Sequence, residues 1–211
     1  MIGLLHELFL TMELPFLFSL KNITQKSSRN HCCCRVSYYM AIYALGDKYP
    51  KIHEDAYVHP AAVVIGDVEI GADSTVWPSA VLRADYGSVV VGTETSIQDG
   101  TVVHATAGLV TRIGSRCVIG HLAHLEGCTI EDDSLIGSGS IVLHRAIVES
   151  NSVVGANAVI TNDMIVPAFS MALGVPAKIS PNAVHRGMLS VIVENYVANG
   201  RRYKLELNRL D

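Results

Sequence analysis

The sequence predicts a parallel β-helix in which each six-residue repeat forms one short side of a triangular coil. Three observations carry this prediction: aliphatic residues recur every six positions, glycine often follows an aliphatic residue directly, and a small residue stands four positions after most of the aliphatic ones. An amphipathic helix would place apolar residues three and four apart, and a strand would place them two apart, so a strict period of six fits neither. The aliphatic positions are Val91, Ile97 and Val103, then Ile130, Ile136, Val142, Val148, Val154 and Ile160.

Each position of the repeat has a structural reason. The aliphatic residue is expected to point into the coil, the glycine to make the corner, and the small residue to fit the tapering interior. Stacked coils then share one core, so stability builds coil by coil. The small residues are Thr95, Thr101, Ser134, Ser140, Ala146, Ser152 and Ala158.

The first part of the chain differs in character from the rest. Residues 1–39 contain an apolar stretch that is interrupted by Glu7, Glu13 and Pro15 and is too short to span a membrane. The segment also lacks the positively charged start of a signal peptide. We therefore expect residues 1–39 to lie outside the functional fold, with Met40 as an alternative start of translation.

The repeats place the β-helix domain at 40–181, and a C-terminal α-helix is expected over 182–211. Apolar residues follow a helical stripe there, so this helix is expected to lie along the coil and cover its apolar surface. The stripe consists of Leu189, Ile192, Val193, Tyr196 and Val197.

Composition narrows the class of partner. The formal net charge is −4, and the only clustered basic residues in the repeat and helix regions are Arg201 and Arg202. Neither nucleic acid nor a membrane surface is therefore expected as a partner. The five cysteines include the consecutive triplet at 32–34, which is a poor disulfide framework and favours free thiols in a reducing cytoplasm.

The six-residue rhythm breaks at three places. Residues 85–88 and 105–108 are expected to insert short loops. Ile119 and Ile136 are seventeen residues apart, one short of three repeats. Distortions of this kind often lie beside functional sites, as bulges do in sheets.

Three histidines, His104, His121 and His124, lie in or beside this irregular region. His104 and His121 are seventeen residues apart, close to the length of one coil. That spacing can bring the two side chains to similar heights on one edge, or on facing edges of neighbouring subunits. Two imidazoles with a third donor nearby are what zinc or a similar divalent metal requires.

Together these residues resemble the gamma-class carbonic anhydrase family, over about residues 41 to 203. The resemblance implies a left-handed β-helix assembled as a homotrimer, with a metal between adjacent subunits held by three histidines drawn from both. It also implies the reversible hydration of carbon dioxide to bicarbonate. The motifs that carry it are Arg83-x-Asp85, Gln98-Asp99-Gly100-Thr101-x-x-His104, Ile119-Gly120-His121, Gly127-Cys128 and Asn195-Tyr196.

The resemblance assigns roles to several of these residues. Arg83 and Asp85 match the pair that bridges subunits and orders the site. Gln98 matches the residue that hydrogen-bonds the metal-bound water, with Asp99 beside it. Tyr196 is added to the expected site residues from the closing helix. The implied metal is zinc, with iron or cobalt as alternatives.

The metal ligands match only in part. His104 and His121 match two of the three histidines, but Glu126 stands at the position of the third. Either Glu126 itself coordinates, or a local change of register brings His124 inward instead; a third reading pairs Glu126 with an arginine and binds no metal. A carboxylate ligand cancels part of the charge of the metal, which would raise the pKa of bound water and weaken or abolish hydration activity.

Two other classes of function compete with this one. A hexapeptide-repeat acyltransferase would transfer an acyl group from acetyl-coenzyme A with a histidine as general base. His144 is the candidate for that base, although a solvated loop histidine explains it more simply. The remaining class is a non-catalytic trimer that binds a small anion.

Overall fold

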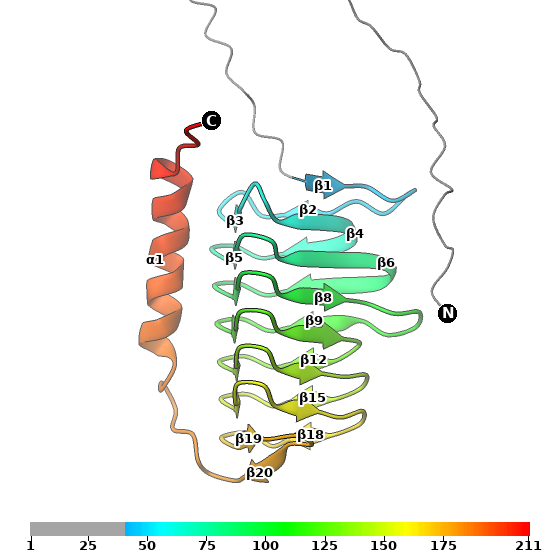
Figure 1. The fold of residues 1–211 in the computed structure, drawn as a ribbon, viewed down its shortest axis with the longest axis vertical. Helices are drawn as coiled ribbons and strands as arrows, with labels where there is room; N and C mark the ends of the chain where they lie inside the picture. The colour runs from blue at the N-terminus through cyan, green and yellow to red at the C-terminus, as the bar shows by residue number, and fades with distance from the viewer. Residues whose placement is uncertain (1–40) are drawn as a thin grey trace, which may run out of the picture. The chain divides into compact units, whose positions relative to one another are not determined.

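The computed structural model describes residues 41–211. The expectations for residues 1–39 and for the cysteine triplet at 32–34 therefore lie outside the described residues. The described chain is a left-handed parallel β-helix with one C-terminal α-helix beside it (Figure 1). This confirms the fold class that the six-residue period and the resemblance predicted.

The coil has three faces, each a stack of short parallel strands in register. The first face consists of β3 (Tyr57–Val58), β5 (Thr75–Val76), β7 (Ser96–Ile97), β10 (Val118–Ile119), β13 (Leu135–Ile136), β16 (Val153–Val154) and β19 (Met171–Leu173), and β20 (Lys178–Ser180) pairs antiparallel with β19. The second face consists of β1 (Ala41–Tyr43), the first halves of β4 (Val63–Ile70) and β6 (Val81–Val91), then β8 (Val102–His104), β11 (His124–Glu126), β14 (Ile141–Val142) and β17 (Val159–Ile160). The third face consists of β2 (Lys51–Ile52), the second halves of β4 and β6, then β9 (Thr111–Ile113), β12 (Thr129–Ile130), β15 (Ile147–Val148) and β18 (Ile165–Val166).

The aliphatic residues of the repeat form the core, as predicted. All nine of the six-residue positions named above are at most 2% exposed. The buried aliphatic residues of successive coils form a single cluster, so the coils share one continuous interior. Burial of this apolar surface is the main stabilising contribution of the fold.

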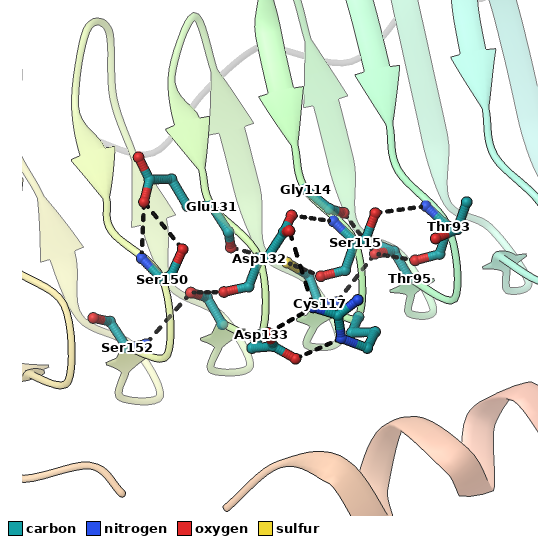
Figure 2. A network of polar contacts seen from close by, with 12 residues as sticks. Thr93, Thr95, Gly114, Ser115, Cys117, Glu131, Asp132, Asp133, Ser150 and Ser152 are labelled. Atoms are coloured by element: carbon teal, nitrogen blue, oxygen red, sulfur yellow. Dashed lines mark hydrogen bonds and ion pairs between the residues drawn. The ribbon is translucent and has the colours of Figure 1, made fainter. Parts of the chain in front are cut away.

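The small residues of the repeat do more than fit a narrow interior. Thr95 Oγ1 donates to the carbonyl oxygen of Gly114 at 2.7 Å and accepts from the backbone N–H of Cys117 at 3.0 Å. Figure 2 shows this corner between the third and first faces, where Ser134 and Ser152 continue the same ladder in later coils. The hydroxyls therefore satisfy buried backbone groups that the strand ladders leave unpaired at the corners.

The expected role of the glycines is wrong in one respect. Gly92, Gly120 and Gly137 do not make the left-handed turn, which falls two residues later, at Glu94 and Leu122 for the first two of these glycines. A Cβ on Gly137 would lie 2.5 Å from the backbone nitrogen of Ala156 in the next coil. Glycine is needed there because successive coils approach each other too closely for any side chain.

Two of the three breaks in the rhythm behave as expected. Residues 105–108 form a loop, and Ile119 pairs directly with Ile136 despite the short spacing. The insertion expected at 85–88 is present, but it lies within a strand: β6 runs from Val81 to Val91 and serves the second and the third face in turn. Ala84 pairs with Gly66 and Val89 pairs with Val68, so four residues of β6 stand opposite a single residue of β4 at this corner.

The C-terminal helix α1 (Ser190–Glu206) packs against the first face. The Trp77 ring lies between two helix rings, with centroids 5.0 Å from Tyr203 and 6.2 Å from Tyr196. Arg201 adds two hydrogen bonds to the Asp73 carboxylate, at 2.9 and 3.0 Å. The helix thus covers apolar surface of the coil, as expected.

The helix is shorter than the segment 182–211 in which it was expected. Residues 182–189 form turns, and the helix begins only at Ser190. Leu189 and Val193 are buried as the stripe predicted, but Ile192 is 39% exposed, so its place on the buried stripe is wrong. No helix among residues 41–211 is long and apolar enough to cross a membrane.

Candidate metal and catalytic site

The predicted site begins with three outward side chains on neighbouring strands of the second face. Arg83 in β6 pairs in register with His104 in β8, and His104 pairs with Glu126 in β11. Side chains at such directly opposed positions stand close together on one face of a sheet. The structure therefore brings Glu126 beside His104 within one protomer.

His104 lies between two carboxylates. Its Nε2 is 2.9 Å from Asp85 Oδ1, and its Nδ1 is 2.9 Å from Glu126 Oε1. Each ring nitrogen of His104 therefore has a carboxylate oxygen within hydrogen-bond distance. Arg83 pairs with the other oxygen of Asp85 and extends the row of polar contacts.

Glu126 contacts two more histidines. His124 Nε2 is 3.4 Å from Glu126 Oε2, and His144 Nε2 is 3.6 Å from Glu126 Oε1. We call Asp85, His104, His124, Glu126 and His144 the carboxylate–histidine cluster. No arginine pairs with Glu126 among the described residues, so the arginine reading of Glu126 is not what the structure shows.

Both carboxylates of the cluster are held in their charged form. Burial acts to raise the pKa of Glu126, but the hydrogen bond to His104 and the charge of His104 outweigh it, with a further contribution from His144 at 3.6 Å, so the pKa lies below its ordinary value. Burial likewise opposes ionisation of Asp85, and hydrogen bonds from His104 and Arg83 hold its pKa below the usual range.

The backbone around the cluster is fixed by a buried threonine. Thr111 in β9 accepts a hydrogen bond from the Gly127 N–H at 2.7 Å and donates one to the carbonyl oxygen of His104. Gly127 itself has a φ of +58°, in the left-handed region, at the shortened corner after Glu126. The compressed step that the sequence showed is therefore the corner that aims Glu126 at His104.

His124 needs no change of register to approach the cluster. Leu125 is fully buried and points inward, so the two residues on either side of it both point outward. His124 pairs in register with Val102 and Ile141, in an otherwise apolar row. The expected alternative, in which His124 turns inward, is not seen.

His121 lies at the opposite edge of the second face. It stands in the turn before β11, whereas Glu126 ends that strand. Its Nδ1 is 3.0 Å from Asp99 Oδ2, and its side chain is half exposed. When a carboxylate accepts from Nδ1–H, the lone pair is on Nε2, which is the arrangement that orients a metal-binding imidazole.

Two other predicted residues lie away from the cluster within one protomer. Gln98 is buried at the corner after β7, next to Asp99 and therefore near His121. Tyr196 lies on α1 against the first face and does not meet the cluster in the same chain. Their expected roles stay predictions.

Sequence reasoning missed two contributors, Thr111 and the contact of His144 with Glu126. His144 was expected to be a solvated loop residue; it does lie in a turn with a side chain that is 33% exposed, but its Nε2 is buried and faces Glu126. No local pattern points to either residue, because each acts from a different coil. The lengths of the intervening coils would have been needed to place them.

The described residues of one protomer do not group three or more histidine, cysteine or acidic side chains into a metal site. They do supply two adjacent donors, His104 and Glu126, and a third at the far edge, His121. Burial raises the pKa of the Cys117 and Cys128 thiols to about 12, so these cysteines are neutral core residues. The donor set fits a metal only if two copies contribute to it.

The fold and this cluster define the class of protein as a hexapeptide-repeat β-helix with a histidine and carboxylate site on one outer face. The bacterial transferase hexapeptide family, described by six repeats, matches residues 49–84 and 127–162. The carnitine operon protein CaiE of Proteus sp. (strain LE138) is 40% identical over 139 residues, which cover 66% of this chain and 71% of that protein. The chain belongs to the gamma carbonic anhydrase-like family of hexapeptide-repeat proteins.

Two further proteins are similar to this chain over a large part of its length. Gamma carbonic anhydrase 2, a mitochondrial protein of Arabidopsis thaliana, is 38% identical over 138 residues, which cover 63% of this chain and 50% of that protein. The chain thus spans about half the length of this plant relative. The solved structure of a hexapeptide transferase family protein from Anaplasma phagocytophilum is also similar, with 34% sequence identity and a TM-score of 0.73. The match covers 78% of this chain and 98% of that protein.

Proposed function

We propose that this protein is a metal-dependent, carbonic anhydrase-like enzyme that acts on carbon dioxide and bicarbonate as a homotrimer. The observation that carries the proposal is the row of Arg83, His104 and Glu126 in register on the second face, with His121 at the opposite edge of the same face. Zinc is the metal proposed, with iron or cobalt as alternatives. Such a metal supplies a Lewis-acidic centre that lowers the pKa of bound water.

The placement of the donors favours a site shared between copies. His104 and Glu126 stand at one edge of the face and His121 at the other, so one protomer alone cannot close the set. In a closed ring, one edge of each copy meets the opposite edge of the next. His104 and Glu126 of one copy and His121 of its neighbour would then hold the metal together.

The surface between those edges also suits an interface. The outward row that contains His124 is otherwise apolar: Val81, Val102, Ile141 and Val159 flank it on the neighbouring strands. Val102 is exposed in the single chain. Contiguous apolar surface of this kind is typical of a contact between subunits.

The residues of this chain have separate tasks in the proposed site. Asp99 orients the His121 ring through Nδ1, which leaves Nε2 for the metal. His104 must exchange one of its two carboxylate contacts before it can coordinate, and the remaining carboxylate then holds the ring in place. Glu126 as a ligand adds negative charge, so hydration activity at neutral pH is expected to be low.

Metal analysis and stopped-flow carbon dioxide hydration on matched variants test the proposal. His104→Ala and His121→Ala should each remove the metal, because the two remaining donors hold it poorly. His124→Ala should leave it in place. Retention of the metal in His104→Ala, or its loss in His124→Ala alone, would contradict the proposed donor set.

The acyltransferase class is not favoured by a specific contact. Its candidate base, His144, points its Nε2 at Glu126 inside the cluster rather than toward open space. A cytoplasmic location also stays a prediction, since the named plant relative is mitochondrial.

A further inference from the structure

His144 has a buried ring nitrogen that the proposed function does not use. It lies in the turn between β14 and β15, one coil beyond Glu126. Its Nε2 is buried and has no hydrogen-bond partner among the described residues. The nearest acidic oxygen is Glu126 Oε1 at 3.6 Å, the same oxygen that contacts His104 Nδ1 at 2.9 Å.

The fold around Glu126 is built to admit this ring. A Cβ on Gly127 would stand 2.9 Å from His144 Cδ2, so any larger residue there would push the ring away. The turn is held in place from both sides: Arg145 N–H donates to the Gly127 carbonyl at 2.7 Å, and Asp163 N–H donates to the His144 carbonyl at 3.1 Å. The backbone of the turn that carries His144 is therefore fixed beside Gly127, within reach of the Glu126 side chain.

We propose that His144 is the positioning residue of Glu126, and that the two side chains act as one unit. In the tautomer that carries its proton on Nε2, a buried N–H without an acceptor is unfavourable, and the Glu126 carboxylate is the acceptor that the structure offers it. Held between His104 and His144, the carboxylate cannot rotate toward solvent. This positions the oxygen that the proposed metal site requires, so the inference rests on the proposed function for its role in chemistry.

The other neighbour of the carboxylate is less suited to this task. His124 contacts the second oxygen at 3.4 Å, and its side chain is 37% exposed against 33% for His144, so overall exposure hardly separates the two. The difference lies in the ring nitrogen, because only the Nε2 of His144 is buried without a hydrogen-bond partner among the described residues. Water cannot easily replace His144, whose Nε2 is closed off from solvent.

The pairing has a consequence for any attempt to restore three histidine ligands. A metal-binding imidazole needs an acceptor for its second ring N–H. A histidine at position 126 would face His104 and His144, which offer donors and no carboxylate. We therefore expect that Glu126→His alone gains little and that Glu126→His with His144→Asp gains much more.

The first experiment needs no metal. Imidazole ¹⁵N resonances are recorded for the metal-free full chain, with His144→Ala, His144→Gln and the matched control His185→Gln, an exposed histidine in the turns before α1. The His104 nitrogens should shift in His144→Ala, because the shared oxygen is released. They should stay close to wild type in His144→Gln, whose amide N–H can still donate, and in the control. Unchanged His104 resonances in His144→Ala would overturn the pairing.

The second experiment measures zinc affinity by equilibrium dialysis for wild type, Glu126→His, His144→Asp and the double variant. The double variant should bind zinc at least about tenfold more tightly than Glu126→His, the usual effect of a missing orienting partner. Equal zinc affinity of these two variants would show that a carboxylate at position 144 does not help to orient a histidine at position 126. If no variant bound zinc, the proposed function would fall, whereas the pairing would still be decided by the His104 resonances.

Discussion

At the scale of single residues, Glu126 has the strongest influence on the chemistry. It shares its two oxygens among three imidazoles, and its charge is retained because hydrogen bonding and the charge of His104 outweigh the cost of burial. A neutral histidine there would leave more positive charge on a bound metal. The replacement of one donor by a carboxylate is thus expected to lower activity without abolishing metal binding.

Arg83 illustrates how the state of assembly changes the energy of one ion pair. Its side chain is 43% exposed in the single chain, and that of its partner Asp85 is 19% exposed. Solvent screening limits such a pair to about 1 kcal/mol. If a neighbouring subunit covers the pair, loss of one partner costs on the order of 3 to 5 kcal/mol, because an unpaired charge stays buried.

We therefore predict that Arg83→Ala weakens the trimer more than it weakens the fold of one chain. Sedimentation should show dissociation, and the melting temperature should fall and become dependent on protein concentration. Arg145→Ala, which breaks the solvent-exposed pair with Asp163, is the matched control and should change neither measurement. Identical behaviour of the two variants would make Arg83 an ordinary surface residue.

At the scale of elements, the spacing between coils is set by backbone contact. The glycines that follow the aliphatic residues lie against the next coil, and the left-handed corners are made by other residues two positions later. Most of these corner residues are not glycine, so their strain of about 1 kcal/mol each is offset by the regular stacking. The hydroxyls of Thr95 and Ser152 add hydrogen bonds that join neighbouring coils.

Gly137→Ala is expected to destabilise the coil by about 3 kcal/mol, because its Cβ would meet backbone atoms of the next coil at 2.5 to 2.8 Å. Gly108→Ala is the control: its φ is +77°, but nothing lies within 4 Å, so only about 1 kcal/mol of backbone strain is expected. Urea unfolding of both variants checks the difference. Equal losses would show that close approach between coils is not what requires glycine.

At the scale of the whole molecule, the proposed site exists only where two copies meet. His104 and Glu126 belong to one edge of the second face and His121 to the other, so a ring of copies contains one complete set at each contact. The apolar row between the edges would lie in that contact.

Subunit mixing tests this arrangement directly. His104→Ala and His121→Ala chains, each without metal, are unfolded together and refolded as a mixture. A complete set of proposed ligands returns wherever a His121→Ala copy supplies His104 and its neighbour, a His104→Ala copy, supplies His121. Random mixing gives this arrangement at about a quarter of all contacts between subunits. Metal content should rise accordingly, and no recovery on mixing would mean that the ligands belong to one chain.

Residues 1–39 are proposed to be dispensable for this assembly. The coil and α1, residues 41–211, belong to one compact unit. A chain that starts at Met40 should therefore give the same circular dichroism and the same sedimentation as the full chain. Loss of the trimer on truncation would show that the first segment takes part in assembly.

The sequence by itself determined the architecture, because the six-residue pattern is local: each aliphatic residue must point inward whatever the length of the neighbouring coils. It also pointed to His104, His121 and Glu126 through their motifs. Its assignment of the left-handed corners to the glycines that follow aliphatic residues failed for Gly92, Gly120 and Gly137, although Gly66 does have a φ of +81°. The period shows where a glycine stands but not whether its torsion angle or the approach of the next coil requires it.

Only the tertiary structure decided which side chains meet. The coils differ in length, with Ile97 paired to Ile119 and Ile119 to Ile136, so contacts between coils cannot be counted from a constant period. The register places Glu126 beside His104, and the shortened corner at Gly127 admits His144 from the following coil. These contacts depend on stacking between segments that are distant in sequence. The motifs therefore indicated the candidate ligands, but only the fold showed which side chains hold the Glu126 carboxylate.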